Sequence, residues 1–349
     1  MNNRGIFIAV EGPIGVGKTT LANILNQHFG YTLLREIVEE NPFLSKFYTD
    51  IKEYALQTEA FFLFNRFKQL EDIKDFNPKH IFECGQCFRW IKEDDESYTG
   101  VAKGRVINVS KQGDKVFLKN TNLDDFNNIW FEYFDLGTDY GKIKDILRNM
   151  DEHLEKATEF GEGIRILKQD GWEMLISFII SSNNRIPMIQ KAINNLSREF
   201  GTYIGEYNGK EYYAFPTPEQ LSKASQEQIR ACQTGFRDKY IKSTTDSVIL
   251  NNKNISEYTK LNTEECLKEL LKFNGVGPKV GDCIALFGMQ KYDTFPVDVW
   301  VKRVMQEFYV EEDLSLPKIR AYAIDKFKEL SGFAQQYLFY YARELGIGR

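Results

Sequence analysis

The sequence is poor in the side chains that most often bind metals or activate hydroxyl nucleophiles. Among its 349 residues there are 3 histidines and 5 cysteines. The histidines show no ligand spacing, and the C-x-x-C pair of Cys84 and Cys87 has no second pair to complete a zinc or iron–sulfur site. We therefore expect no metal centre, favour packing over redox chemistry for these cysteines, and exclude Ser–His hydrolysis. An odd number of cysteines also argues against a disulfide framework.

Long hydrophobic runs and low-complexity stretches are missing as well. No apolar run is long enough to cross a membrane, and no signal peptide precedes the first apolar segment at residues 6–10. The sequence therefore predicts a cytoplasmic protein without membrane contact, nucleoid-associated in a bacterium. With 42% hydrophobic and 14% aromatic residues it can bury a large core. Its length favours about two or three domains.

Neither sign of charge dominates. The formal net charge is −5, from 45 lysines and arginines against 50 aspartates and glutamates. Nucleic acids are attracted by a local basic face rather than by a basic total, so this charge does not exclude them. Basic residues that could form such a face lie near Arg237 or near the Gly-x-Gly stretch at residues 275–277 in sequence: Arg237, Lys239, Lys242, Lys272, Lys279, Lys302 and Arg303.

One short stretch carries most of the chemical information: Phe273-Asn274-Gly275-Val276-Gly277-Pro278-Lys279-Val280-Gly281-Asp282-Cys283. The apolar spacing over residues 265–273 predicts a helix that Gly275 ends in a left-handed conformation. Pro278 suits the first turn of a second helix. Two helices joined by a Gly-x-Gly turn expose backbone amides at a positive helix end. The pattern therefore predicts a phosphate site at Gly275 and Gly277.

Lys279 and Asp298 are the candidate catalytic residues beside this turn. Lys279 falls in the first turn of the second helix, where the helix dipole and partial burial are expected to lower its pKa and make it a nucleophile. Asp298 begins another helical pattern, over residues 299–309, and would stabilise a developing cation. Taken singly, a solvated lysine and a helix N-cap are the simpler interpretations. Together, after this hairpin, they favour a catalytic pair.

Residues 273–298 resemble the helix-hairpin-helix Gly/Pro-Asp DNA glycosylase superfamily, and the chain from about residue 77 onward is similar to 8-oxoguanine DNA glycosylases. The resemblance implies a mostly α fold with a small antiparallel β-sheet, and a monomer that needs no cofactor and acts on damaged double-stranded DNA. Lys279 would attack C1′, expel the base and form a Schiff base that permits strand cleavage, with Asp298 in support. Further stretches carry the resemblance: Cys84-Gly85-Gln86-Cys87-Phe88-Arg89-Trp90, Ser177-Phe178-Ile179-Ile180-Ser181-Ser182-Asn183-Asn184, Gly235-Phe236-Arg237 and Phe333-Ala334-Gln335 through Phe339.

The same resemblance implies a pocket for the flipped base. Phe339 and Cys283 would sandwich the base, an aromatic face on one side and a sulfur on the other. Gln335 would read its Watson–Crick edge. The carbonyl of Gly85 would accept a hydrogen bond from the N7–H that 8-oxoguanine has and guanine lacks.

For the opposite strand, the resemblance implies that Asn183 and Arg237 hold the orphaned cytosine while Phe236 fills the stack. This chain departs from the animal members of the family at two positions. Met188 stands where they have an arginine that reads the cytosine, so we expect a weaker preference for cytosine opposite the lesion. Trp300 stands where they have a histidine that contacts phosphate, which puts that backbone contact in doubt.

A different pattern opens the chain. Residues 6–10 form a short apolar run, residues 20–29 have helical spacing, and between them lies Gly12-Pro13-Ile14-Gly15-Val16-Gly17-Lys18-Thr19, which matches G-x-x-x-x-G-K-[ST]. This order predicts a nucleotide-binding P-loop. In it Gly12 and Gly17 let amides converge on phosphate, Lys18 supplies charge and Thr19 binds Mg²⁺.

Residues 1–72 resemble the start of bacterial deoxynucleoside kinases, with Glu36 at the position of the catalytic base and Gln57 facing the nucleobase. The substrate-gripping segment and the arginine-rich lid of such a kinase do not follow, and so few strands cannot cover a parallel sheet. The alternative function, deoxynucleoside kinase activity or ATP binding, is therefore incomplete. We expect weak binding of ATP and Mg²⁺ at most.

These patterns divide the chain into three parts. We predict a truncated α/β P-loop segment over residues 1–74, an antiparallel β-sheet domain over 75–160 that carries Gly85, and a helical domain over 161–349 with the helix-hairpin-helix at about 265–289. Strand-like runs at residues 106–109 and 115–118 support the sheet. The residues on either side of the C-x-x-C pair are also expected to be strands around a turn.

Overall fold

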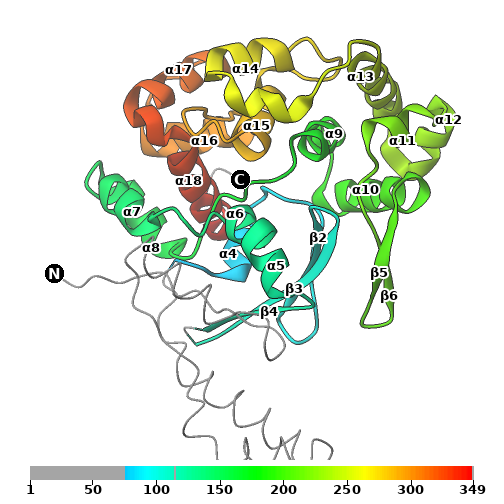
Figure 1. Cartoon of the computed structure of the whole chain (residues 1–349). Coiled ribbons are helices and arrows are strands. Elements are labelled where there is room, and N and C mark those ends of the chain that lie inside the picture. Colours follow the sequence, from blue (N-terminus) through cyan, green and yellow to red (C-terminus); the bar gives the residue numbers. More distant parts are fainter. Residues whose placement is uncertain (1–74, 114, 348–349) are drawn as a thin grey trace, which may run out of the picture.

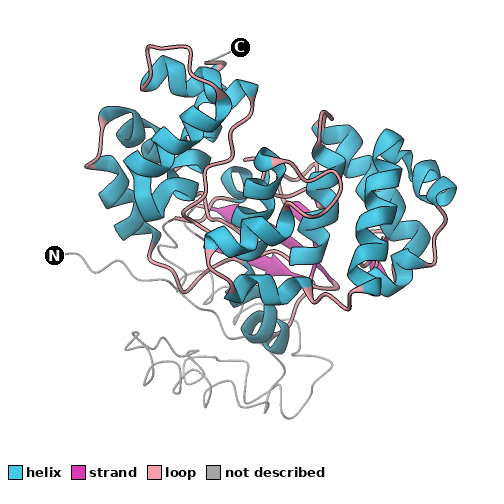
Figure 2. Cartoon of the chain, turned by 90° about the horizontal axis from the view of Figure 1, so that it is seen from above, coloured by secondary structure: helices cyan, strands magenta, loops and turns pink. Residues whose placement is uncertain are grey.

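The computed structural model describes residues 75–113 and 115–347, so the predicted P-loop residues, from Gly12 to Glu36, lie outside the described residues. The described chain is mostly helical, with a four-stranded sheet and a separate two-stranded hairpin (Figure 1). Figure 2 shows helices on both sides of the strands. The predicted fold class of mostly α structure with a small antiparallel sheet is confirmed for this part of the chain.

The larger sheet is a simple antiparallel meander in the order β1-β2-β3-β4. Its strands are β1 Trp90–Lys92, β2 Tyr98–Ala102, β3 Arg105–Gln112 and β4 Lys115–Lys119. The last two confirm the strand-like runs of the sequence. Trp90 packs so closely across β2 that a β-carbon at Gly100 would lie 2.3 Å from its ring, and it stacks on Phe82 with ring centroids 3.8 Å apart. These aromatic rings form the core between the sheet and the preceding helix.

One expectation for this region is wrong. The residues before Cys84 form helix α4 (Pro78–Phe82), not a strand, because Asn77 caps the helix by accepting from the Lys79 amide and Pro78 fits its first turn. Several helical segments follow β4 within the region of the sheet: α5 Leu123–Asp125, a π-helical turn Phe126–Trp130, α6 Phe131–Tyr133, α7 Tyr140–Arg148 and α8 Glu152–Phe160. The Asp139 and Asp151 side chains cap α7 and α8.

The remaining described chain is helical apart from one hairpin, β5 Tyr203–Tyr207 and β6 Lys210–Tyr213, that the sequence analysis did not anticipate. Helix α9 is buried on almost all sides, as its predominantly apolar sequence requires. Its neighbour α15 approaches so closely that a β-carbon at Gly288 would lie 2.9 Å from Cβ of Met174. The longer helices are α9 Gly171–Ser181, α10 Ile186–Phe200, α13 Asp238–Leu250, α14 Thr263–Leu270, α15 Pro278–Met289, α16 Val299–Phe308, α17 Leu316–Phe327 and α18 Ser331–Leu345, and the short ones are α11 Pro218–Ser222 and α12 Gln226–Ile229.

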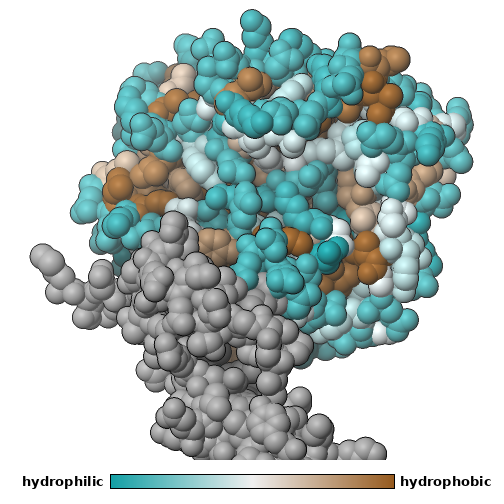
Figure 3. All heavy atoms as spheres, in the orientation of Figure 1, coloured by the Kyte–Doolittle hydropathy of each residue, from teal (hydrophilic) through white to brown (hydrophobic). Residues whose placement is uncertain are grey.

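Helix α18 links the two halves of the described structure. It packs against α8, α16 and α17, and its Gln336 side chain donates to the backbone of Cys84, just after α4 (Figure 1). Because of this link, residues from the first and last described segments lie side by side. No helix within the described residues is long and apolar enough to cross a membrane. On the face seen in Figure 3, hydrophilic residues predominate and apolar ones form separate patches.

Candidate active site and DNA-binding surface

The turn between α14 and α15 has the geometry that its glycines predict. Gly275 adopts φ +87°, and a β-carbon there would lie 2.9 Å from Cβ of Tyr240 on α13, so a side chain is excluded. Gly277 begins α15 without a side-chain cap, and nothing lies within 4 Å of the position of its missing β-carbon. The first amides of α15 therefore stay open to an anion, at the positive end of a helix.

Lys279 lies in the first turn of α15, with Cys283 one turn further along the helix. The pKa of Lys279 is raised, first by the Cys283 sulfur and then by the Asp298 carboxylate, although burial acts in the opposite direction. The expectation of a lowered pKa is therefore wrong for the protein without DNA. Burial raises the pKa of the Cys283 thiol to about 11, so lysine and thiol both hold their protons at neutral pH. The lysine must lose a proton before it can act as a nucleophile.

Asp298 is the N-cap of α16, the simpler interpretation of its sequence position. Its Oδ1 accepts from the Val301 amide at 2.8 Å and so caps α16. Its carboxylate also acts on the charge of Lys279. Helix α15 is held in turn by Asp282, whose carboxylate receives two hydrogen bonds from Arg320 on α17, at 2.5 and 2.8 Å. The nucleophile and the carboxylate therefore come from helix starts that are each fixed by side-chain contacts.

Gly85 and Phe339 lie against each other although 254 positions of sequence separate them. Gly85 adopts φ +86°, and a β-carbon there would lie 3.3 Å from Cε1 of Phe339. On its other side Phe339 meets Trp300 in an edge-to-face contact, with ring centroids 4.9 Å apart and an interplanar angle of 87°. Trp300 is two residues beyond Asp298, so this row of contacts connects the Gly85 loop with the start of α16.

Gln335 lies one helical turn before Phe339 on α18. Its side chain is buried, and its Oε1 atom has no hydrogen-bond partner among the described residues. A buried amide oxygen without a donor costs free energy, so native proteins rarely keep one without a functional reason. The position beside Phe339 is the one expected of a group that meets a ligand.

Arg237, Asn183 and Phe236 form a second cluster. Nε and NH2 of Arg237 donate to the Ser182 carbonyl at 2.9 and 2.5 Å, and NH2 also donates to the Asn183 carbonyl at 2.9 Å. The guanidinium carbon lies 4.4 Å from the centre of the Phe236 ring, which is 51% exposed. Asn183 adopts φ +49°, which this arginine supports. Met188, on the first turn of α10 nearby in sequence, is 43% exposed.

The basic residues that were expected to form one face are partly neutralised by acidic neighbours. Lys242 pairs with Asp246 at 2.9 Å and Lys302 with Asp313 at 2.6 Å, and Lys272 pairs with Glu269. Arg237 donates to the backbone carbonyls of Ser182 and Asn183, as described above. DNA binding at this surface would therefore rely on the open backbone amides of the Gly275–Gly277 turn and on only a few unpaired basic side chains among the described residues.

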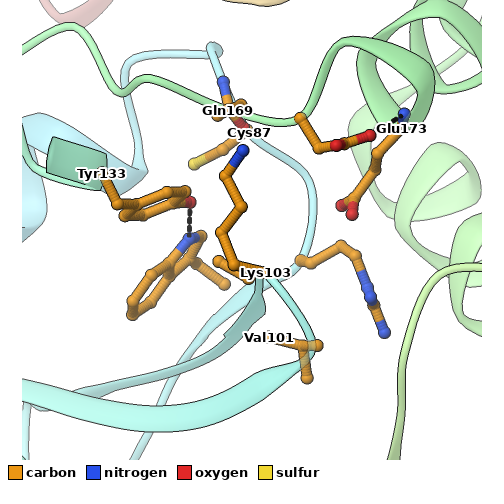
Figure 4. Close-up of a pocket in the computed structure, with 10 residues that line it drawn as sticks. Cys87, Val101, Lys103, Tyr133, Gln169 and Glu173 are labelled. Carbon is orange, nitrogen blue, oxygen red and sulfur yellow. Dashed lines mark hydrogen bonds between the residues drawn. The ribbon is translucent and has the colours of Figure 1, made fainter. Parts of the chain in front are cut away.

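A small cavity that the sequence analysis missed lies behind the Gly85 loop. Its volume is about 10 Å³, close to the space that one water molecule occupies, and Figure 4 shows Cys87, Gln169 and Glu173 around it. Burial raises the pKa of Glu173 to about 7, against the opposing charge of Arg89. NH1 of Arg89 is buried without a partner among the described residues, and NH2 donates to the Tyr213 carbonyl at 2.5 Å. The Phe-Arg-Trp part of the motif marks Arg89, but nothing local marks Glu173.

The structure thus brings most of the expected site residues into two groups. Lys279, Cys283 and Asp298 are in electrostatic contact, and Gly85 and Phe339 are in van der Waals contact near the buried Gln335. No group of histidine, cysteine, aspartate and glutamate side chains suited to a metal ion is found within residues 75–347, Asp114 excepted.

Comparison with known proteins agrees with this arrangement. The family model of the 8-oxoguanine DNA glycosylase N-terminal domain matches residues 69–175, and that of the HhH-GPD superfamily base excision DNA repair proteins matches residues 176–329. An N-glycosylase/DNA lyase of Arabidopsis thaliana is 30% identical over 282 residues, which are 74% of this chain and 75% of that protein. The N-glycosylase/DNA lyase of Saccharomyces cerevisiae is 32% identical over 261 residues, 66% of this chain and 67% of that protein.

A solved structure is more similar still. It is a Clostridium acetobutylicum 8-oxoguanine glycosylase/lyase in complex with double-stranded DNA that contains cytosine opposite 8-oxoguanine. The two chains are 53% identical, the match covers 78% of this chain and 94% of that chain, and the TM-score is 0.76.

The amino-terminal part has different relatives. The deoxynucleoside kinase family model matches residues 8–89. The deoxyguanosine kinase of Bacillus subtilis is 56% identical over 84 residues, 24% of this chain, and the chain spans 39% of that kinase. Glycosylase relatives cover most of the chain, and kinase relatives cover only its start. The chain therefore belongs to the 8-oxoguanine DNA glycosylase family of helix-hairpin-helix DNA repair enzymes, with a partial deoxynucleoside kinase sequence at its amino-terminal end.

Proposed function

We propose that this enzyme excises 8-oxoguanine from double-stranded DNA and cleaves the strand at the resulting abasic site. The observation that carries the proposal is the placement of Lys279 in the first turn of α15, next to the open Gly275–Gly277 turn, where Cys283 and the Asp298 carboxylate raise its pKa. An amine, a carboxylate and a phosphate-binding turn are the groups that this chemistry needs. The family membership described above supports the same activity.

Each chemical step has a residue to perform it. Lys279, once deprotonated, attacks C1′ of the flipped nucleotide while the bond from C1′ to the base breaks, and the base leaves with that electron pair and gains a proton. Asp298 stabilises the positive charge that develops on the sugar. The nitrogen then loses a proton, the bond from C1′ to the ring oxygen breaks, and that oxygen takes up a proton, so that the open sugar is joined to Lys279 by an imine. Loss of a proton from C2′ breaks the bond from C3′ to oxygen, which cleaves the strand.

Four residues form the pocket for the flipped base in this proposal. Phe339 and Cys283 lie on its two faces, Gln335 meets its Watson–Crick edge with the amide that lacks a partner, and the Gly85 carbonyl accepts from N7–H. Guanine has a lone pair at N7 where 8-oxoguanine has a hydrogen. The Gly85 carbonyl would therefore repel guanine and bind 8-oxoguanine. A site built around a single hydrogen bond discriminates strongly because the wrong base leaves a buried group unpaired.

On the opposite strand, we propose that Asn183 and Arg237 hold the unpaired base and that Phe236 fills the gap in the stack. The half-exposed Phe236 and the left-handed Asn183 turn support this assignment. Met188 has no hydrogen-bond donor and cannot select cytosine. The enzyme is therefore expected to accept several bases opposite the lesion.

The amino-terminal segment supports a narrower proposal. Its match to the deoxynucleoside kinase family favours weak binding of ATP with Mg²⁺ at Lys18 and Thr19, without phosphoryl transfer. Titration of labelled ATP into the full chain and a Lys18→Ala variant tests this. Equal affinity in the two proteins would contradict it. We further propose a cytoplasmic enzyme that acts as a monomer.

Borohydride trapping tests the main proposal most directly. A duplex with one 8-oxoguanine opposite cytosine is incubated with the full chain, with Lys279→Gln, and with Lys156→Gln as a control. Lys156 is exposed on α8 and pairs only with Glu152. We expect the full chain and the control to excise the base and to form a covalent adduct, and Lys279→Gln to do neither. Trapping by folded Lys279→Gln would assign the nucleophile elsewhere, and no excision by the full chain would overturn the proposed substrate.

A further inference from the structure

The backbone carbonyl groups of Cys84, Gly85 and Gln86 differ in whether they accept a hydrogen bond. The Cys84 carbonyl accepts from Nε2 of Gln336 at 2.7 Å, and the Gln86 carbonyl accepts from Nε2 of Gln169 at 2.7 Å. Between them, the Gly85 carbonyl receives no hydrogen bond from any residue that the structure describes. The peptide groups on both sides are anchored, and the middle one keeps its acceptor available.

Both anchoring amides are fixed in the protein interior. Gln336 is 1% exposed, on α18, and Gln169 is 7% exposed, two residues before α9 begins. A side chain in the loop itself adds to the restraint. Gln86 donates to the carbonyls of Arg165 and Ile81 at 2.7 and 2.9 Å. Buried amides that are bonded at both ends restrict the backbone strongly, because any shift would break hydrogen bonds in a low-dielectric environment.

A carbonyl that is to sense one hydrogen atom must keep its direction. A peptide group rotates when its neighbours rotate to compensate, and the anchors on Cys84 and Gln86 prevent that compensation. Gly85 itself adopts φ +86°, a conformation that a residue with a side chain would rarely take, so the backbone at the middle carbonyl depends on glycine. Gln336 also directly follows Gln335, so one turn of α18 fixes both the group facing the base edge and the loop behind it.

We propose that Gln336 and Gln169 are positioning residues for damage recognition, whose side-chain amides hold the carbonyls on either side of Gly85 and so fix the direction of the one that reads N7–H. The inference rests on the proposed function of Gly85. In this proposal, α18 and the segment before α9 contribute to selectivity without contacting the base. Neither residue acts on the sugar, so the strand-cleavage step does not depend on them.

The test compares selectivity with strand cleavage. Gln336→Met and Gln169→Met keep the length of the side chain but remove the donor. For each protein, single-turnover rates are measured on a duplex with 8-oxoguanine opposite cytosine, on the same duplex with guanine, and on a preformed abasic site. The control is Asn108→Leu, which removes a buried amide that bonds Ser97 and Thr99 within the sheet, away from the Gly85 loop. Thermal unfolding shows whether the variants are folded.

We expect each glutamine variant to lose roughly tenfold in the ratio of 8-oxoguanine to guanine excision, while cleavage of the abasic site stays within about twofold of the full chain. The control should lose stability without a change in that ratio. An unchanged ratio in both folded glutamine variants, or an equal loss on all three substrates, would overturn the positioning role. Failure of the unaltered chain to excise 8-oxoguanine at all would instead refute the proposed function.

Discussion

A β-carbon added at Gly85 would lie 3.3 Å from Cε1 of Phe339, in a backbone conformation of φ +86° that side chains rarely adopt. Gly85→Ala therefore combines strain with displacement of the ring proposed to stack on the base. We expect a loss of about 1–2 kcal/mol in the free energy of unfolding and a more than tenfold (~1.4 kcal/mol) loss of 8-oxoguanine excision. Chemical denaturation and single-turnover excision measure the two effects.

Gly104→Ala is the matched control for that change. Gly104 has φ +70°, and nothing lies within 4 Å of a β-carbon placed there. It should show the strain without the loss of excision. Similar excision rates for Gly85→Ala and Gly104→Ala would mean that the contact with Phe339 has no part in base recognition.

Met188→Arg is expected to increase the preference for cytosine opposite the lesion. The side chain is 43% exposed, so an arginine fits without disturbing the core, and stability should change by less than about 0.5 kcal/mol. A bidentate contact to a base edge contributes roughly 1–3 kcal/mol of discrimination, or about fivefold to 150-fold in relative rate. Excision is compared with cytosine, adenine, guanine and thymine opposite 8-oxoguanine. Ile186→Arg, on the same helical turn and 45% exposed, is the control, and an equal gain there would point to non-specific charge.

The excision rate should increase with pH because the attacking amine must be neutral. The pKa of Lys279 is raised above its usual value by Cys283 and Asp298 despite its burial. Single-turnover rates should therefore rise about tenfold per pH unit between about pH 6 and 9, the range in which the lysine is mostly protonated. A plateau that begins below about pH 8 would contradict this, and would show that bound DNA lowers the pKa.

Glu173 predicts a change of stability with pH. Its pKa is raised to about 7 by burial, so its contribution to stability is complete below its unfolded pKa near 4.5 and is lost as the pH rises to about 7. Glu173→Gln has no such loss. The variant should match the unaltered chain at about pH 4.5 and exceed it by at most about 3 kcal/mol above about pH 7, measured by denaturant unfolding. Glu159→Gln, on the surface of α8, should differ little at any pH, and a flat difference curve for Glu173→Gln would exclude the shifted pKa.

Local signals explain which parts of the structure were predictable from sequence. Gly275 and Pro278 mark the end of one helix and the start of the next, and the observed turn follows them closely. The strand expected before Cys84 is wrong because Asn77 and Pro78 start a short helix there. The expected shift in the pKa of Lys279 is also wrong in direction, because the pKa is raised and not lowered. The helix dipole and burial can be inferred from sequence, but the opposing influence of Cys283 and Asp298 appears only when α15 and α16 are placed together.

The anchoring glutamines were beyond the reach of any local pattern. Gln336 bonds a carbonyl 252 positions away, and Gln169 bonds one 83 positions away. One indirect signal exists. Gln335 and Gln336 stand side by side in the apolar stretch 332–342 of α18, which marks both as buried amides that need partners. The first has none within the described protein, and the second meets Cys84.

Because α18 holds the Gly85 loop, the base pocket is completed only after α18 has been synthesised. Ribosomes complete α18 after every other described helix, so the nucleophile Lys279 is synthesised before Gln335, Gln336 and Phe339 are. Contacts between such distant positions close late in folding, because the loop between them must first lose its freedom. A growing or carboxyl-terminally shortened chain would carry the reactive lysine without a finished base pocket. Selectivity for the damaged base therefore becomes available only when α18 docks.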